Sequence, residues 1–248
     1  MGLTIHYSLA TTITKVEDIR TLVKSLQQSA RDLPFKEVDD VVEFQGEEAD
    51  FSNFSTDDPK RWLKVQAGQY VSDPGNKERS YSVNPLHIVA FSTWPGEGCE
   101  EANFGLCRYP ATIDSRGRRI KTGLTGWRWR SFCKTQYASD PQCGGVANFL
   151  RCHLCVIRFL DLVRSSGLVK VEVSDEGNYW EHRDLKKLGS EVGEWNEMIA
   201  AVSGILKDDA TAHGISLESA IAAFPNFEHL EAKGRERLQS LRERHSQG

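Results

Sequence analysis

The stretch of the sequence most suggestive of chemistry is a Cys-x-x-Cys pair with a histidine inside it: Cys152, His153 and Cys155. Thiolates and imidazole are common zinc ligands, but a structural zinc site normally takes a second Cys-x-x-Cys at a similar spacing. Here only Cys133 and Cys143 could complete the set, and they are not spaced in that way. We therefore predict no metal and no cofactor for this chain.

The helical periodicity around these residues suggests another interpretation. On a helical wheel, residues 146–164 gather apolar side chains on one broad face, with His153 near its middle and Cys152 and Cys155 on its flank. Free cysteine behaves as a small buried hydrophobe, so both thiols fit a core without any metal. We predict that this segment is the buried side of a helix.

A histidine on the core face of a helix needs partners for its two ring nitrogens. His153 either bonds to a backbone carbonyl or a tyrosine within the core, or points into a polar pocket beneath the sheet. In the second case an enzyme of hydrolase or transferase type would use an acid–base pair there. The residues predicted for that pair are His153, Tyr137, Asp175 and Glu176. The sequence leaves both alternatives open.

The formal charges are unevenly distributed along the chain, although the net charge is only −4. Residues 37–58 contain nine acidic residues and no basic one, whereas residues 108–134 contain eight basic residues and a single acid, Asp114. Such a split can steer an anionic partner, or the two segments can face and neutralise each other. The sequence alone does not decide between these two arrangements.

The basic segment runs into WRWRSFCKTQY, residues 127–137, in which aromatic rings alternate with Arg and Lys. Phosphates are bound by long cationic side chains, and nucleic-acid bases stack on flat rings. The period of two predicts a half-buried strand, which would place the rings and the cations on opposite faces. The cationic side is then the better candidate for a binding surface.

We predict a basic cleft near residues 134–137 that binds an anionic ligand: a nucleotide, a nucleic acid or a phosphorylated small molecule. The side chains expected to contact this ligand are Arg108, Arg128, Arg130, Lys134, Gln136, Trp180 and Arg183. Gly144 and Gly145, before the following helix, would expose backbone N–H groups that attract phosphate. A protein–protein interaction module is a further alternative, because the charged segment 227–245 has only a thin apolar stripe. A second copy of the chain or another protein would pack on that stripe.

The elements that must position these residues follow from hydrophobic periodicity. Strands are predicted near residues 3–10, 41–45, 62–67, 86–93, 103–110, 127–138 and 168–175. Helices are predicted from residue 16 to Pro34, over 146–164, from Ser190 to 206, from Ser216 to Pro225 and over 227–245. Thr14 and Glu17 fit a capping box at the start of the first helix.

This order of elements predicts an α+β fold, with an open, mostly antiparallel sheet and a helical C-terminal region. The sheet would be built from two pseudo-repeated strand–helix–strand halves, at residues 3–45 and 127–175, with both helices on one face. The predicted domains are an α+β domain at 1–182, with halves 1–95 and 96–182, and a C-terminal helical region at 183–248 packed on it.

The composition is that of a folded globular protein, with 39% hydrophobic and 27% charged residues among 248. No apolar run approaches the roughly 20 residues needed to span a bilayer, so we expect no membrane partner. The N-terminus has neither a basic leader nor a long apolar block, which predicts a cytoplasmic protein with reduced thiols.

Overall fold

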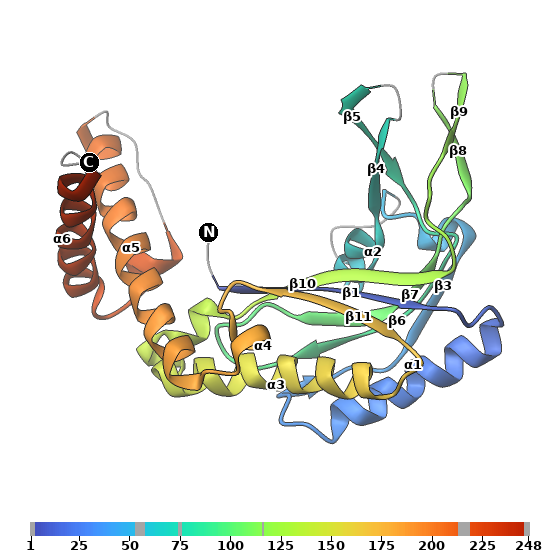
Figure 1. Ribbon diagram of the computed structural model, residues 1–248, viewed down its shortest axis with the longest axis horizontal. Coiled ribbons are helices and arrows are strands. Elements are labelled where there is room, and N and C mark those ends of the chain that lie inside the picture. Colours follow the sequence, from blue (N-terminus) through green and yellow to red (C-terminus); the bar gives the residue numbers. More distant parts are fainter. Residues whose placement is uncertain (1–2, 53–57, 74–75, 116, 213–218, 246–248) are drawn as a thin grey trace.

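Figure 1 shows the computed structural model of the chain, which describes residues 3–52, 58–73, 76–115, 117–212 and 219–245. A seven-stranded antiparallel sheet lies at the centre, in the order β11-β1-β10-β7-β6-β2, with β3 also paired to β6. Its strands are β1 (Thr4–Thr11), β2 (Glu37–Val38), β3 (Val42–Gln45), β6 (His87–Trp94), β7 (Ala102–Arg108), β10 (Trp127–Lys134) and β11 (Lys170–Asp175).

The helices lie on different sides of this sheet. α1 and α3 run along one face, which we call the covered face, and α2 lies on the opposite, open face (Figure 1). The α-helices are α1 (Val16–Arg31), α2 (Arg61–Ala67), α3 (Gly145–Ser165), α4 (Tyr179–His182), α5 (Leu185–Ala212) and α6 (Phe227–His245). Short 3-10 turns are η1 (Gly46–Ala49), η2 (Gln136–Ser139), η3 (Pro141–Cys143) and η4 (Ala220–Ala223).

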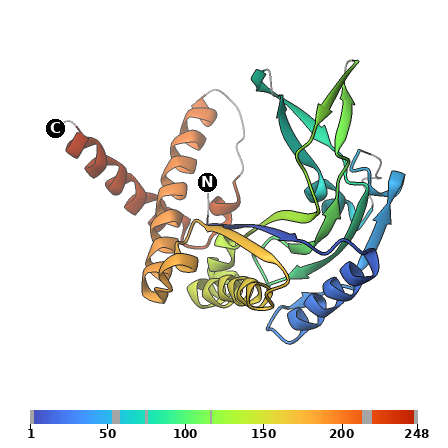
Figure 2. The same cartoon turned by 45° about the vertical axis from the view of Figure 1, so that its right-hand side comes forward.

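Two small hairpins project from the sheet on the side away from α1 and α3, while α5 and α6 stand at the other end of the molecule (Figure 2). The hairpins are β4 (Gln69–Asp73) with β5 (Asn76–Val83), and β8 (Thr112–Ser115) with β9 (Arg118–Lys121). The open face of β1, β10 and β11 therefore lies between the hairpins and the C-terminal helices. In the described part of the chain, no helix is long and apolar enough to cross a membrane.

The main core lies between the sheet and the two helices of the covered face. Phe159 of α3 packs against Phe104 of β7, with ring centroids 4.4 Å apart. At the other side of the core, the Arg20 guanidinium of α1 donates hydrogen bonds of 2.8 and 2.7 Å to Glu43 of β3. These bonds lower the pKa of Glu43 to about 2, so this carboxylate stays ionised and holds α1 to the sheet.

The prediction of a buried helix around the cysteine pair is confirmed. Cys152, His153 and Cys155 all lie on the buried side of α3, with exposed fractions of 0%, 0% and 1%. The helix begins at Gly145, and the preceding Gly144 adopts φ = 106°, a left-handed conformation that favours glycine. Asp140 caps the turn before it by accepting a hydrogen bond from the Gln142 backbone N–H.

The segment at residues 62–67 differs from its prediction, because it forms the helix α2 and not a strand. The sequence holds the signals of a helix, since Pro59 precedes it and Gly68 follows its last residue. The side chain of Asp58 also accepts a hydrogen bond from the Lys60 backbone N–H at 2.8 Å. α2 lies against the open face of the sheet (Figure 1).

The helix boundaries correct two further predictions and leave a third untested. The capping box at Thr14 and Glu17 is wrong, because Lys15 is the N-cap of α1 and makes no side-chain capping bond. α5 begins at Leu185 and runs through Ser190, which is therefore not its cap. The predicted helix start at Ser216 lies outside the described residues.

The α+β fold, the antiparallel sheet and the helical C-terminal region are confirmed. The pseudo-repeat is not confirmed by the sheet order. β10 and β11, the strands of the proposed second half, flank β1, whereas β3 of the proposed first half pairs with β6 near the opposite edge. The two strand–helix–strand units therefore occupy different surroundings in one sheet.

The contact between β6 and β7 requires glycine at position 105. A Cβ atom added to Gly105 would lie 2.4 Å from the Ala90 Cβ atom and 2.5 Å from the Val89 carbonyl oxygen. We expect Gly105→Ala to lower the free energy of unfolding by about 1–3 kcal/mol, the cost of overpacking, in urea denaturation. The control is Gly193→Ala in α5, where the added methyl meets no atom within 4 Å and helix propensity improves. Equal stability of the two variants would contradict this packing.

Candidate functional site

The open face of the sheet carries the basic side chains predicted for ligand binding on β10. This strand alternates strictly, with its Trp residues buried beneath the sheet and its cations pointing outward. The outward residues are Arg128, Arg130, Phe132 and Lys134. On the neighbouring β1, Ser8 is paired with Arg130 and His6 with Phe132, so small and polar side chains leave the cations uncovered.

A hollow of about 390 Å³ lies over Arg128 and Arg130, and we call it the basic groove. It is lined chiefly by Arg128, Arg130, Lys170, Gln69, Tyr70 and Tyr109. The Arg130 guanidinium makes no hydrogen bond or ion pair with any residue that the structure describes, and the Arg128 guanidinium donates only to the Thr125 carbonyl, at 3.3 Å. The carboxylate that lines the basic groove, Glu172, already forms an ion pair with Lys170 at 2.6 Å. The groove therefore presents free positive charge.

Beside the basic groove, β10 separates from β7. The two strands pair only at Trp127 with Arg108 and at Arg128 with Cys107, and then diverge. Side chains fill the opening from the covered face, because Tyr7 Oη and Trp129 Nε1 both donate to the Asn103 carbonyl, at 2.8 and 2.7 Å. We call this opening the fork.

Farther along, β10 is bridged again to the chain before β7. Here the Glu100 backbone N–H donates to the Lys134 carbonyl at 3.0 Å, and the Lys134 N–H donates to Glu100 Oε2 at 3.3 Å. The fork is therefore closed at both ends. From the open face, Gln66 of α2 reaches into it, accepting at Oε1 from Ser131 at 2.6 Å and from Asn103 at 3.0 Å.

A second hollow, of about 400 Å³, lies over the fork, and we call it the fork pocket. Its lining residues are Trp62, Gln66, Glu100, Glu101, Asn103 and Phe132. Trp62 and Phe132 are 52% and 40% exposed, so the pocket presents aromatic surface to solvent. Phe132 and Arg130 lie on the same face of β10, so aromatic and cationic surfaces adjoin.

The predicted catalytic residues His153 and Asp175 lie together in the core. His153 Nε2 lies 3.2 Å from Asp175 Oδ2, and its Nδ1 lies 2.9 Å from the Thr135 hydroxyl. A carboxylate only accepts, so Nε2 carries a proton toward Asp175. The Thr135 hydroxyl also contacts the Leu3 carbonyl oxygen, at 3.4 Å. The His153 side chain is 0% exposed. This geometry supports a structural role in joining α3 to the end of β11.

Asp175 is the anchor of that arrangement. Burial by itself raises the pKa of this carboxyl group, but His153 and the backbone N–H groups of Trp180 and Gly177 together lower it below the ordinary value. The two backbone bonds measure 3.0 and 2.9 Å. Asp175 thus also fixes the turn that leads into α4.

The other predicted site residues around 134–137 are divided between surface and interior. Lys134 Nζ lies 4.5 Å from the centre of the Tyr137 ring, near the far end of the fork. Gln136 is fully buried. Its side-chain oxygen accepts a hydrogen bond from the Leu3 backbone N–H at 3.3 Å, and its side-chain nitrogen donates to Asn196 Oδ1 of α5 at 3.0 Å. Gln136 therefore docks α5 against the sheet.

The remaining predicted residues lie away from the basic groove. Trp180 stacks under Arg183, which binds Asp161 of α3 at 2.7 and 2.9 Å. Arg108 is paired in register with Trp127, so it projects to the opposite side of the sheet from Arg128. Glu176 accepts a hydrogen bond from the Thr4 backbone N–H at 2.9 Å. The structure thus brings together Arg128 and Arg130 but not the whole predicted set.

The acidic segment does not neutralise the basic one. Asp39 pairs with Lys60, Glu43 pairs with Arg20, and Asp58 pairs with Lys64. Within the described ranges, no ion pair joins residues 37–58 to residues 108–134.

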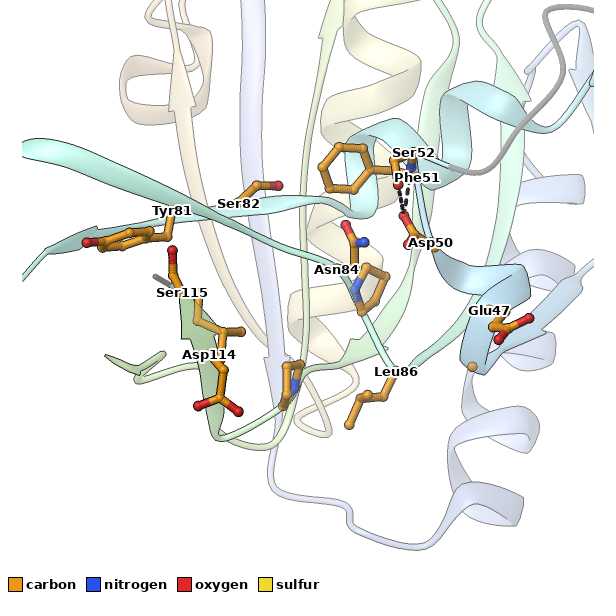
Figure 3. A pocket seen from close by; sticks show the side chains of 14 residues that line it. Glu47, Asp50, Phe51, Ser52, Tyr81, Ser82, Asn84, Leu86, Asp114 and Ser115 are labelled. Carbon is orange, nitrogen blue, oxygen red and sulfur yellow. Dashed lines mark hydrogen bonds between the residues drawn. The ribbon is translucent and has the colours of Figure 1, made fainter. Parts of the chain in front are cut away.

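Another hollow, of about 830 Å³, lies between η1, β5 and β8 and is shown in Figure 3. Its acidic side chains do not converge on one point, and Asp50 is bound to Ser52 by bonds of 2.8 and 2.6 Å that lower the pKa of Asp50. Throughout the part of the chain that the structure describes, no three His, Cys, Asp or Glu residues gather closely enough to hold a metal ion.

Sequence reasoning missed Trp62, Gln66 and Tyr70, the residues that bring aromatic and amide groups to the open face. Trp62 and Gln66 belong to the segment predicted as a strand at 62–67, and Tyr70 follows it. The helix signals at Pro59 and Gly68 could have located α2, but not the face of the sheet against which it packs.

Comparisons with known proteins add no relationship: a scan against protein-family models, a search of curated proteins and a search of solved structures each found no match.

Removing the charge of Asp175 tests its structural role. We expect Asp175→Asn to destabilise the protein at neutral pH by about 2–4 kcal/mol, because buried donors lose their acceptor. The pKa of Asp175 is lower in the folded state, so its contribution is present above about pH 4 and is lost as the pH falls further. Urea denaturation at several pH values should show the difference from the natural protein shrinking under acidic conditions.

The control for this measurement is Glu172→Gln on the same strand, which removes an exposed carboxylate and should leave stability unchanged. A difference for Asp175→Asn that does not vary with pH would contradict the assignment.

Proposed function

We propose that the open face of the sheet binds nucleotides, free or within a single strand of nucleic acid, and that their phosphates occupy the basic groove. The observation that carries this proposal is the guanidinium of Arg130, which has no partner among the described residues and lies next to Arg128 on a face that also exposes aromatic rings. A cation without a counter-ion gains from an anionic ligand, and phosphate accepts the two parallel hydrogen bonds that a guanidinium offers.

The aromatic side chains around the groove favour nucleotides over other phosphorylated molecules. Tyr70 of β4 lines the basic groove and is 72% exposed, and Phe132 lies two residues from Arg130 on the same face of β10. Bases stack on such rings with any sequence, while the charged groove follows the backbone. A sugar phosphate without a base would use only half of this surface.

Arg130→Gln tests the groove. We expect it to weaken binding of a mixed-sequence single-stranded oligonucleotide and to reduce the slope of log affinity against log salt by about 0.7, the share of one phosphate contact on a single strand. Fluorescence anisotropy over a range of salt concentrations measures both quantities.

The matched control is Arg158→Gln, which removes the same charge from the exposed surface of α3 on the covered side. Three results would count against the proposal: no binding at low salt, an affinity independent of salt, or an equal loss in the two variants.

A further inference from the structure

The fork pocket contains hydrogen-bond acceptors that lack a donor among the described residues. Asn103 forms its floor and is fully buried, with its amide nitrogen donating to Gln66 at 3.0 Å. Its side-chain oxygen Oδ1 is buried and has no hydrogen-bond donor among the residues that the structure describes. A buried acceptor without a donor is energetically unfavourable, so the floor of the pocket favours a hydrogen-bond donor over an acceptor.

Carboxylates stand at the rim of the same pocket. The Glu101 side chain makes no hydrogen bond with the described residues. Partial burial raises the pKa of Glu101. The nearby charges of Asp39 and Glu37 raise this pKa further, and only part of the rise is offset by Lys60. Glu100 is held in place by its bonds to Lys134. A partly desolvated carboxylate gains from a ligand that donates hydrogen bonds.

The apolar walls of the pocket suit a flat ring. Trp62 projects from α2 and Phe132 from β10, and each leaves much of its ring exposed. The Arg61 guanidinium covers the Trp62 ring at 4.9 Å from its centre. The volume of about 400 Å³ is within the range of small-ligand sites.

We infer that the fork pocket takes the base of the nucleotide whose phosphate lies in the basic groove, and that it selects guanine. This inference rests on the proposed function. Guanine presents two neighbouring N–H donors on one edge, which a single carboxylate such as Glu101 accepts side by side. Uracil and thymine present one N–H between two carbonyl oxygens, which the carboxylates repel. Guanine therefore matches the carboxylates at the rim of the pocket.

The spacing of the two hollows fits one nucleotide. Arg130 and Phe132 point the same way along β10 and are two residues apart, or about 7 Å. A base against Phe132 therefore leaves its own phosphate within reach of the Arg130 guanidinium. The same strand places Arg128 one further step away, where the next phosphate of a chain would lie.

Titration calorimetry at low salt with GMP, AMP, CMP and UMP tests the inference, because the four ligands share a ribose phosphate and differ only in the base. We expect GMP to bind at least about tenfold more tightly than UMP, as one good pair of base contacts allows. Glu101→Gln should remove most of this preference for GMP. Trp62→Ala should weaken the binding of all four nucleotides. Arg130→Gln should weaken all four by one factor and leave the preference intact.

The control Glu48→Gln, on the exposed surface of η1, should bind all four like the natural protein. Equal affinities for the four ligands, or a preference for UMP, would overturn the inference and leave the phosphate groove standing. No binding of any nucleotide would overturn both. A final competition experiment adds free arginine or guanosine to the GMP complex. If arginine displaces GMP and guanosine does not, the pocket takes a guanidinium group, and the inference is overturned.

Discussion

The separation of β7 from β10 governs the rest of the open face. Two strands in register would satisfy their backbone groups with each other, but here the Asn103 carbonyl accepts from the side chains of Tyr7 and Trp129 instead. The opening is therefore filled from the covered face by large rings, while among the described residues Gln66 enters it from the open face. This asymmetry leaves the fork pocket on the open face of the sheet.

The strand next to that hollow supplies two kinds of surface. Because successive side chains of β10 point to opposite faces, its tryptophans enter the core while Arg130 and Phe132 remain outside. α2 and the start of β4 then bring Trp62 and Tyr70 against the same face. The cations come from one segment of the chain and most of the exposed rings from another, some sixty residues earlier.

The sequence was sufficient for features that depend on local periodicity. The alternation on β10 predicted which side its cations face, and the helical wheel predicted that His153 is buried. Contacts distant in the chain could not be predicted, because no local signal states which strands pair. Lys134, Trp180 and Arg183 were therefore expected in one cleft, whereas Trp180 and Arg183 pack on α3. The fork pocket depends on two strands failing to pair, for which the sequence carries no recognisable mark.

A crystal structure of the protein with GMP tests the central claim most directly. We expect the guanine ring in the fork pocket against Trp62 or Phe132, its N–H edge facing Glu101, and its phosphate bonded to Arg130. A nucleotide bound elsewhere on the molecule would contradict the account. So would a fork closed by continuous pairing of β7 with β10, because the pocket would then not exist.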